Sequence, residues 1–404
     1  MNNFGKYGLP LDVKFCSKCT ISNQRPSSSI EFKNTKDAKK ETINFSEDGI
    51  CDACRYAEIK KDIDWKSREI ELIAVCNKYR RNDGRFDVLI PGSGGKDSVM
   101  TAHILKYKYN MHPLLITWPP NMYTSQGFEN FNYWLESGYP NYTYWPNLKV
   151  HKILTQLAFR NLVHPFQPFI IGQRNIAPRF SVQFDIPFIM YGENQAEYGN
   201  KISENSNSTM NQSFFSAEKE LDKIYLAGIS AKELMKKYDF TLADMDAYIP
   251  TDPNLLLKTK TEVHYMGYYV KWHPQEVYYY SVENTKFKPN IYRTEGTYSK
   301  YSSFDDKIDW LHYYTTYIKF GIGRATYDSS QEIRNGDITR QDGVNLVKRF
   351  DGEFPNLYLE DNLKYLELSL EEFNSIIDNA RPDHLWKLNQ NGSWELRNKI
   401  WESK

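Results

Sequence analysis

Short apolar runs alternate with amphipathic stretches between residues 86 and 191. A run with the look of a buried parallel strand occupies 86–90, and further strands are predicted over 113–118, 141–145 and 186–191. Apolar residues at helical spacing occupy 97–109, 126–137 and 149–163. Strands that alternate with helices form right-handed crossovers. The pattern predicts an α/β fold with a doubly wound parallel sheet and helices on both faces.

The segments before residue 86 and after residue 191 do not continue this alternation of strands and helices. A helix is predicted over 64–79, with an apolar face made by Ile70, Ile73 and Ala74. Further helices are predicted over 218–226, 231–238 and 305–321, and the chain from about 263 onward has a helical, aromatic pattern. We therefore expect a small module over 1–75, the α/β domain over 76–200 and a helical region over 201–404.

A glycine-rich loop, Ser93-Gly94-Gly95-Lys96-Asp97-Ser98, follows the first predicted strand and opens a helix. Glycines let the backbone approach a phosphate, and successive N–H groups at a helix N-terminus attract anions. A Walker A loop needs Ser or Thr after its lysine, and a dinucleotide loop needs a third glycine; Asp97 stands at both positions. The remaining pattern, SGGxDS, resembles the PP-loop ATP pyrophosphatases. That resemblance implies cleavage of ATP to AMP and pyrophosphate, which activates a carbonyl oxygen as its adenylate.

Four of the five cysteines form two CxxC pairs, Cys16/Cys19 and Cys51/Cys54. Two such turns close a tetrahedron of thiolates, so we expect a structural Zn²⁺ site. An iron–sulfur cluster is the alternative, because four cysteines suit it as well. Cys76 stands alone in a helical pattern, where we expect a buried apolar role.

The amino-acid composition indicates which classes of ligand the protein can bind. Lys plus Arg and Asp plus Glu number 51 each, and this neutrality argues against a long nucleic acid as the main partner. Aromatic residues make up 15% of the chain, which suits sugars, bases or protein partners. No run of 18 apolar residues and no apolar signal core occur, so the expected location is cytoplasmic, without a membrane anchor.

The cysteine inventory also bears on the nucleophile. No cysteine follows Cys76, so nothing downstream of the loop can carry a persulfide. Residue 2 is Asn2, so an N-terminal glutaminase cysteine is absent, and Cys76 lacks a nucleophile elbow. We therefore expect free ammonia, an amine substrate, or ammonia from a partner.

Five motifs occur together in this chain: the paired CxxC, residues 91–98, Tyr191-Gly192-Glu193-Asn194, residues 319–326 and residues 333–340. Together they resemble the bacterial N-acetyl sugar amidotransferases of O-antigen and nonulosonic-acid (pseudaminic, legionaminic) pathways. The resemblance implies conversion of an acetamido group on an N-acetylated sugar or nucleotide sugar to an acetamidino group. It also implies a glutaminase subunit and a cyclase-like subunit as partners that supply ammonia.

The resemblance assigns roles to individual residues. It implies that Ser93, Gly94, Gly95, Lys96, Asp97 and Ser98 bind the phosphates of ATP, with Asp97 also holding Mg²⁺. Glu193 and Asn194 end a strand, where they would hold Mg²⁺, nucleotide or the reacting group, or merely cap a loop. Arg324 would bind a phosphate or a sugar carboxylate, or form a structural ion pair. Asp97, Lys96 and Arg324 are thus the candidate catalytic residues, and Arg179 and Lys319 are weaker candidates.

Two other functions stay open on the sequence. In the first, the protein is a PP-loop enzyme that modifies tRNA, and its metal-binding CxxC pairs help to bind the RNA. A non-catalytic assembly protein would carry a vestigial ATP site, although Gly94, Gly95, Asp97 and Ser98 are all present.

Overall fold

The computed structural model of the chain describes residues 4–193, 202 and 207–403. Its centre is a five-stranded sheet with the order β3-β2-β1-β4-β7, in which every neighbouring pair is parallel. The strands are β1 (Val88–Pro91), β2 (Pro113–Thr117), β3 (Asn141–Thr143), β4 (Phe188–Tyr191) and β7 (Glu262–Tyr265). The chain moves from β1 outward through β2 to β3 and then returns to the other side of β1, so the order reverses between β1 and β4.

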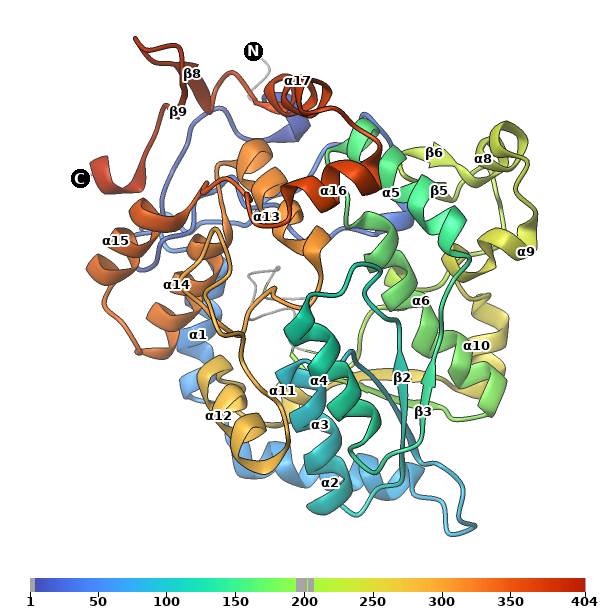
Figure 1. Cartoon of the computed structure of the whole chain (residues 1–404). Coiled ribbons are helices and arrows are strands. Elements are labelled where there is room, and N and C mark those ends of the chain that lie inside the picture. Colours follow the sequence, from blue (N-terminus) through green and yellow to red (C-terminus); the bar gives the residue numbers. More distant parts are fainter. Residues whose placement is uncertain (1–3, 194–201, 203–206, 404) are drawn as a thin grey trace.

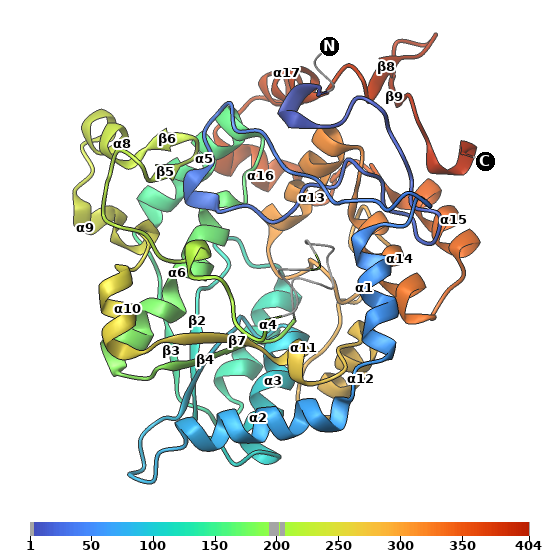
Figure 2. The ribbon, with the colours of Figure 1, turned by 180° about the vertical axis from the view of Figure 1, so that it is seen from behind.

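Side chains from the strands feed two separate cores, because successive residues of a strand point to opposite faces. Leu89 and Ile189 pack with residues of α5 (Leu148–Leu162) and α6 (Gln167–Phe184). Ile90 and Met190 pack on the other face with residues of α2 (Trp65–Tyr79), α3 (Lys96–Tyr107) and α4 (Ser125–Leu135). The helices cover both faces of the sheet (Figures 1 and 2). The predicted α/β class with a parallel sheet is confirmed.

Two elements occur where no such element was predicted. Helix α6 contains Pro168, Gly172 and Pro178, which obscure the helical pattern in the sequence. Gly172 is needed because a Cβ there would lie 2.1 Å from the Trp118 ring. Strand β7 falls in the region expected to be helical, and the sheet thus takes its last strand from beyond residue 200.

Two local predictions were wrong. In the range 218–226, a turn leads into β5 (Tyr225–Leu226), which pairs with β6 (Ile229–Ser230) through Ala227 and Gly228, both at positive φ. That hairpin turn overrides the helix propensity of the preceding residues. On α2, Leu72 and Cys76 are buried, whereas Ile70 and Ile73 are 67% and 42% exposed, so the buried face is the opposite one.

The chain after residue 300 is mainly helical. Its elements are α13 (Lys307–Phe320), α14 (Arg324–Asn335), α15 (Arg340–Phe350), α16 (Leu359–Leu366), α17 (Leu370–Ala380), β8 (Trp386–Leu388) and β9 (Trp394–Leu396). Other helices of the described residues are α1 (Asp52–Lys61), α8 (Ala231–Tyr238), α9 (Leu242–Met245), α10 (Pro253–Thr259), α11 (Met266–Tyr269) and α12 (Pro274–Asn284).

The N-terminal segment runs across these C-terminal helices (Figures 1 and 2). The Tyr7 hydroxyl donates to the carbonyl of Ala380 at 2.9 Å, and Nε2 of His384 lies 3.1 Å from the side-chain oxygen of Gln24. Residues more than 350 positions apart are therefore fixed to one another on this side of the molecule.

Candidate active site

The glycine loop leaves β1 and enters α3, as the sequence predicts. Gly94 has φ +94°, and a Cβ at this position would lie 2.7 Å from the carbonyl oxygen of Asn130. In contrast, a Cβ at Gly95 would meet no described atom within 4 Å. Gly94 is thus required by the fold of the loop, whereas Gly95 leaves room for a ligand to approach the backbone.

The polar side chains of the loop are already bonded. The Lys96 Nζ lies 2.6 Å from an oxygen of Asp97, and the Ser98 hydroxyl donates to the carbonyl of Gly95 at 3.0 Å. The Ser93 hydroxyl donates to the carboxylate of Asp305. Lys96 and Asp97 are partly exposed, at 12% and 29% of their side chains, so a phosphate and a cation can reach them.

The loop lies at the point where the strand order reverses. In open α/β sheets, ligands bind at the carboxyl ends of the strands on either side of such a point. The end of β4 is close by, because a Cβ at Gly192 would lie 3.1 Å from the Cβ of Asp97. Glu193 follows and lines the same cavity as the loop, whereas Asn194 lies outside the described residues.

A cavity of about 610 Å³ opens over the loop. It brings together several of the sequence candidates, namely Ser93, Gly94, Gly95, Lys96, Asp97, Glu193, Lys319 and Arg324. Ser98 does not belong to the lining. Arg179 is also outside it, where its guanidinium binds the carboxylate of Asp246 and the carbonyl of Ile249.

Helix α13 and the residues before it form one wall of this cavity. Its lining side chains Asp305, Asp309, His312, Thr316 and Lys319 recur at intervals of four and three residues, so they share one helix face. Burial raises the pKa of Asp309 to about 7. The sequence prediction missed this polar stripe, although its spacing is visible in a helix that was itself predicted.

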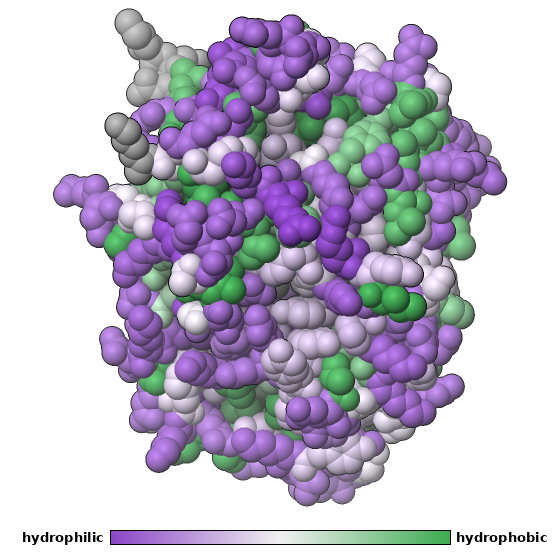
Figure 3. Space-filling model, turned by 60° about the vertical axis from the view of Figure 1, so that its left-hand side comes forward, coloured by the Kyte–Doolittle hydropathy of each residue, from purple (hydrophilic) through white to green (hydrophobic). Residues whose placement is uncertain are grey.

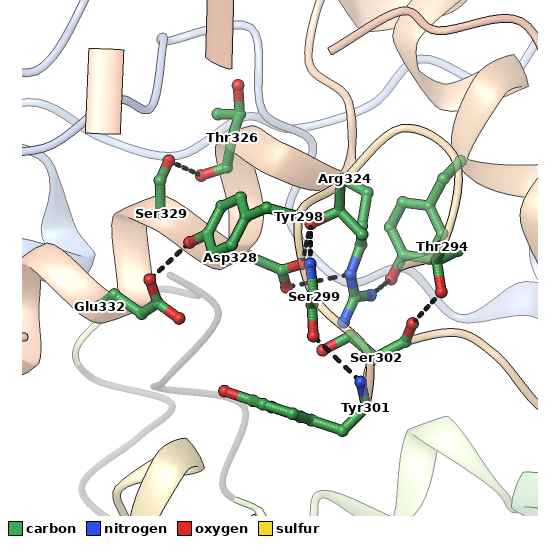
Figure 4. A network of polar contacts seen from close by, with 12 residues as sticks. Thr294, Tyr298, Ser299, Tyr301, Ser302, Arg324, Thr326, Asp328, Ser329 and Glu332 are labelled. Carbon is green, nitrogen blue, oxygen red and sulfur yellow. Dashed lines mark hydrogen bonds and ion pairs between the residues drawn. The ribbon is translucent and has the colours of Figure 1, made fainter. Parts of the chain in front are cut away.

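Arg324, the first residue of α14, is part of a polar network (Figure 4). Its Nε lies 3.0 Å from Oδ1 of Asp328, and its guanidinium also donates to the hydroxyl of Tyr313. Asp328 in turn accepts a hydrogen bond from the Thr297 hydroxyl at 2.6 Å, and Glu332 accepts one from Tyr298. Arg324 is therefore both a cavity residue and a member of an ion pair.

The four paired cysteines come together as predicted. Their sulfur atoms lie within 4.8 Å of one another, all four residues are buried, and none forms a disulfide. The Cys16–Cys54 and Cys19–Cys51 sulfur distances are 3.8 and 3.7 Å. Tetrahedral Zn²⁺ with bonds of about 2.3 Å separates its sulfur ligands by about 3.8 Å. The donor set therefore fits a tetrahedral metal ion.

The cysteine cluster packs against α14, which carries cavity residues, and against α15. The Thr20 hydroxyl lies 2.9 Å from that of Ser329 and 2.7 Å from that of Ser330, both on α14. A guanidinium nitrogen of Arg340, on α15, donates to the carbonyl of Cys16 at 3.1 Å. A metal in this cluster would thus brace α14, which begins with Arg324.

None of the helices in the described ranges has the length and apolar character needed to cross a bilayer. On the face of the molecule shown in Figure 3, hydrophilic side chains predominate and hydrophobic ones occur in small scattered groups.

Comparison with known proteins finds a relative over a short stretch and a family that matches the C-terminal region. A 91-residue stretch is 25% identical to an uncharacterized protein, MJ1599, of Methanocaldococcus jannaschii; it covers 22% of this chain and 32% of that protein. The chain thus matches about a third of the length of this relative. Residues 295–400 match the family described as "LPS biosynthesis protein WbpG-like, C-terminal domain". That range includes α13 and α14, so the chain combines a five-stranded parallel α/β sheet with a C-terminal region similar to that of WbpG-like proteins of LPS biosynthesis.

Proposed function

We propose that the protein is an ATP-dependent amidotransferase that converts the acetamido group of an N-acetylated sugar or nucleotide sugar to an acetamidino group. The observation that carries the proposal is the glycine loop, which lies where the strand order reverses and opens into a cavity that residues of the WbpG-like region also line. The proposal places the enzyme in surface polysaccharide or nonulosonic-acid biosynthesis.

In this proposal, the backbone of Gly94 and Gly95 and the N-terminus of α3 bind the phosphates of ATP. The Lys96 ammonium exchanges its ion pair with Asp97 for one with the pyrophosphate, whose charge it neutralises. The Asp97 carboxylate then binds Mg²⁺, for which carboxylate oxygens are suitable ligands. Bound Mg²⁺ supplies charge neutralisation of the phosphates. The side chains provide positioning and electrostatic stabilisation.

The reaction then has two steps. The acetamido oxygen attacks the α-phosphorus of ATP, pyrophosphate leaves, and an imidate-like adenylate forms. Ammonia attacks the imidate carbon, a proton leaves the nitrogen, and the carbon–oxygen bond to AMP breaks. Arg324, at the cavity wall, is in place to stabilise the anionic groups of substrate or leaving group.

The nitrogen source in this proposal is external to the chain. All five cysteines are buried, and none is among the described residues that line the cavity. The resemblance to the N-acetyl sugar amidotransferases implies that a glutaminase subunit and a cyclase-like subunit would supply the ammonia. The same absence of a cysteine from the described lining disfavours sulfur transfer to tRNA, the alternative PP-loop activity.

The test is to incubate the protein with ATP, Mg²⁺, an ammonium salt and candidate N-acetylated nucleotide sugars. We expect sugar-dependent AMP and a product in which NH replaces the amide oxygen, detected by mass spectrometry. Lys96→Gln should lower the rate by about a hundredfold. Lys108→Gln is the matched control, since Lys108 is exposed at the end of the same helix and pairs with Glu69. The proposal would be refuted if AMP were released at the same rate with and without each sugar and no amidine product formed.

A further inference from the structure

Three basic side chains line the cavity away from the glycine loop. Lys40 lies in the N-terminal segment, Arg174 on α6 and Lys319 near the end of α13. Two histidines, His164 and His312, lie beside them with their rings stacked 4.7 Å apart. We call these five residues the basic wall.

The three cations of this wall are held by neutral oxygen atoms. Lys40 Nζ donates to the Ser29 hydroxyl at 2.9 Å and to the side-chain oxygen of Asn34 at 2.7 Å. Arg174 donates to the carbonyl of Ser29 at 3.0 Å, and Lys319 donates to the carbonyl of Leu162 at 2.7 Å. Within the described part of the chain, no carboxylate oxygen lies within 4.0 Å of the charged nitrogens of these three.

The positive charge of Lys40, Arg174 and Lys319 is not balanced by nearby carboxylates of the described residues. Glu31 lines the same part of the cavity, but its carboxylate accepts hydrogen bonds from Asn34 and Ser29, and its nearest histidine nitrogen, on His164, is 3.7 Å away. Among the described residues, Glu31 is thus the carboxylate that acts on Lys40 and Lys319. Burying charges without a counter-charge is costly, so a cluster of this kind indicates a place for an anion.

The histidines add unused hydrogen-bonding capacity. The Nδ1 atoms of His164 and His312 are buried and have no hydrogen-bond partner among the described residues. Burial lowers the pKa of both rings far below the usual range, with nearby Lys319 contributing to each shift. Neutral rings of this kind can donate or accept, and an anion beside them would favour their protonated form.

Two residues of the basic wall, His312 and Lys319, lie on α13 at a distance from the glycine loop. Asp305 contacts the loop through Ser93, and α13 then runs from Lys307 to Phe320. At 1.5 Å per residue, His312 and Lys319 lie about 10 and 20 Å along the helix axis from Asp305. This separation leaves space for a second substrate between the nucleotide phosphates and the wall.

We propose that the basic wall binds an acidic group, either a phosphate or a carboxylate, of the second substrate. The assignment rests on the proposed function, because it reserves the glycine loop for ATP. The substrate would thus be held at its anionic end by Lys40, Arg174 and Lys319, with its acetamido group directed toward the loop. A neutral N-acetylated sugar would lack this anchor.

Calorimetric titration of the full chain tests the proposal without turnover. The loop is first filled with α,β-methylene-ATP and Mg²⁺, and the titrants are UDP, glucuronate and neutral N-acetylglucosamine. We expect an anion to bind: UDP identifies a phosphate site and glucuronate a carboxylate site. Lys40→Gln and Arg174→Gln should each weaken that binding by about tenfold or more.

Lys39→Gln is the matched control, because Lys39 is an exposed neighbour with the same charge that does not line the cavity. Melting temperatures identify any variant that fails to fold. Because Lys40 and Arg174 lie on separate segments, the second variant still tests the proposal if the first does not fold. The proposal is overturned if neither anion binds, or if the wall variants bind the anion as tightly as Lys39→Gln. Failure of the proposed function is a separate result, the lack of sugar-dependent AMP formation.

Discussion

The Ser93 hydroxyl donates to Oδ2 of Asp305 across 3.2 Å, which joins the glycine loop to a residue 212 positions later. Because α13 begins two residues after Asp305, this bond relates the loop directly to the helix that carries His312 and Lys319. The loop and these two residues of α13 are therefore positioned by one short connection.

Asp305 should influence the cation requirement of the reaction. Burial raises the pKa of this carboxyl, which is the effect that a nearby cation would reverse. We expect Asp305→Asn to raise the Mg²⁺ concentration for half-maximal AMP formation several-fold, whereas Asp361→Asn, an exposed position on α16, should not change it. An unchanged Mg²⁺ dependence in Asp305→Asn would remove Asp305 from the cation site.

The two loop glycines should respond differently to alanine. Gly94→Ala forces a side chain into positive φ and against Asn130, so we expect a loss of at least about 1 kcal/mol in unfolding free energy. Gly95→Ala should leave stability unchanged and weaken ATP binding, since its Cβ would extend into open space. Urea denaturation and nucleotide titration measure the two effects. Equal stability losses would contradict the distinct roles assigned to these residues.

Anion binding at the basic wall should weaken as pH rises through about 7. Burial lowers the pKa of Lys319 to about 7, so the free protein loses this charge above that pH. An anion favours charged Lys319, so binding above pH 7 takes up a proton, and Kd rises by at most about tenfold per pH unit. Among the residues that the structure describes, the charged and titratable groups that face Lys319 are Lys6, Tyr7, Glu31, Lys40, His164 and His312.

Titration in buffers with different ionisation enthalpies measures that proton uptake. Lys319→Met should remove most of it, because the variant lacks the titrating group. A Kd that stays constant between about pH 6 and 8 in the unmodified protein would show that Lys319 does not take part.

Metal removal should disturb the cavity as well as the cysteine cluster. Structural zinc sites contribute on the order of 10 kcal/mol to folding, and Thr20 couples this cluster to α14. We expect Cys51→Ser to lose the metal, lower the melting temperature and weaken binding in the cavity. Cys76→Ala, which changes a cysteine outside the cluster, should keep the metal. Elemental analysis distinguishes zinc from iron, and full metal content in Cys51→Ser would contradict the predicted ligand set.

Strands β1, β2 and β4 were predictable because each is a short apolar run, and a recognisable helix follows β1 and β2. Strand β7 was not, since its four residues include Glu262 and His264, and its identity depends on pairing with β4. On α2, three apolar residues suggested the wrong face, because packing against α11 buries Leu72 and Cys76 instead.

The site was predictable where it is local in sequence. The loop and the two CxxC pairs each follow from a short motif, and the structure brings the four cysteines together. The basic wall was not predictable, because Lys40, Arg174 and Lys319 come from three distant segments that only the tertiary fold unites. Among the wall residues, the sequence singled out Lys319 alone, as a weaker candidate.

The contacts of the N-terminal segment with the C-terminal helices constrain the order of folding during synthesis. Tyr7 and Gln24 leave the ribosome early, but their partners Ala380 and His384 follow 373 and 360 positions later. The four cysteines of the cluster are all synthesised before α14, yet the docking of the cluster through Thr20 must wait for Ser330. The cavity is therefore completed only after translation has passed α14, and a nascent chain released earlier would lack a complete site.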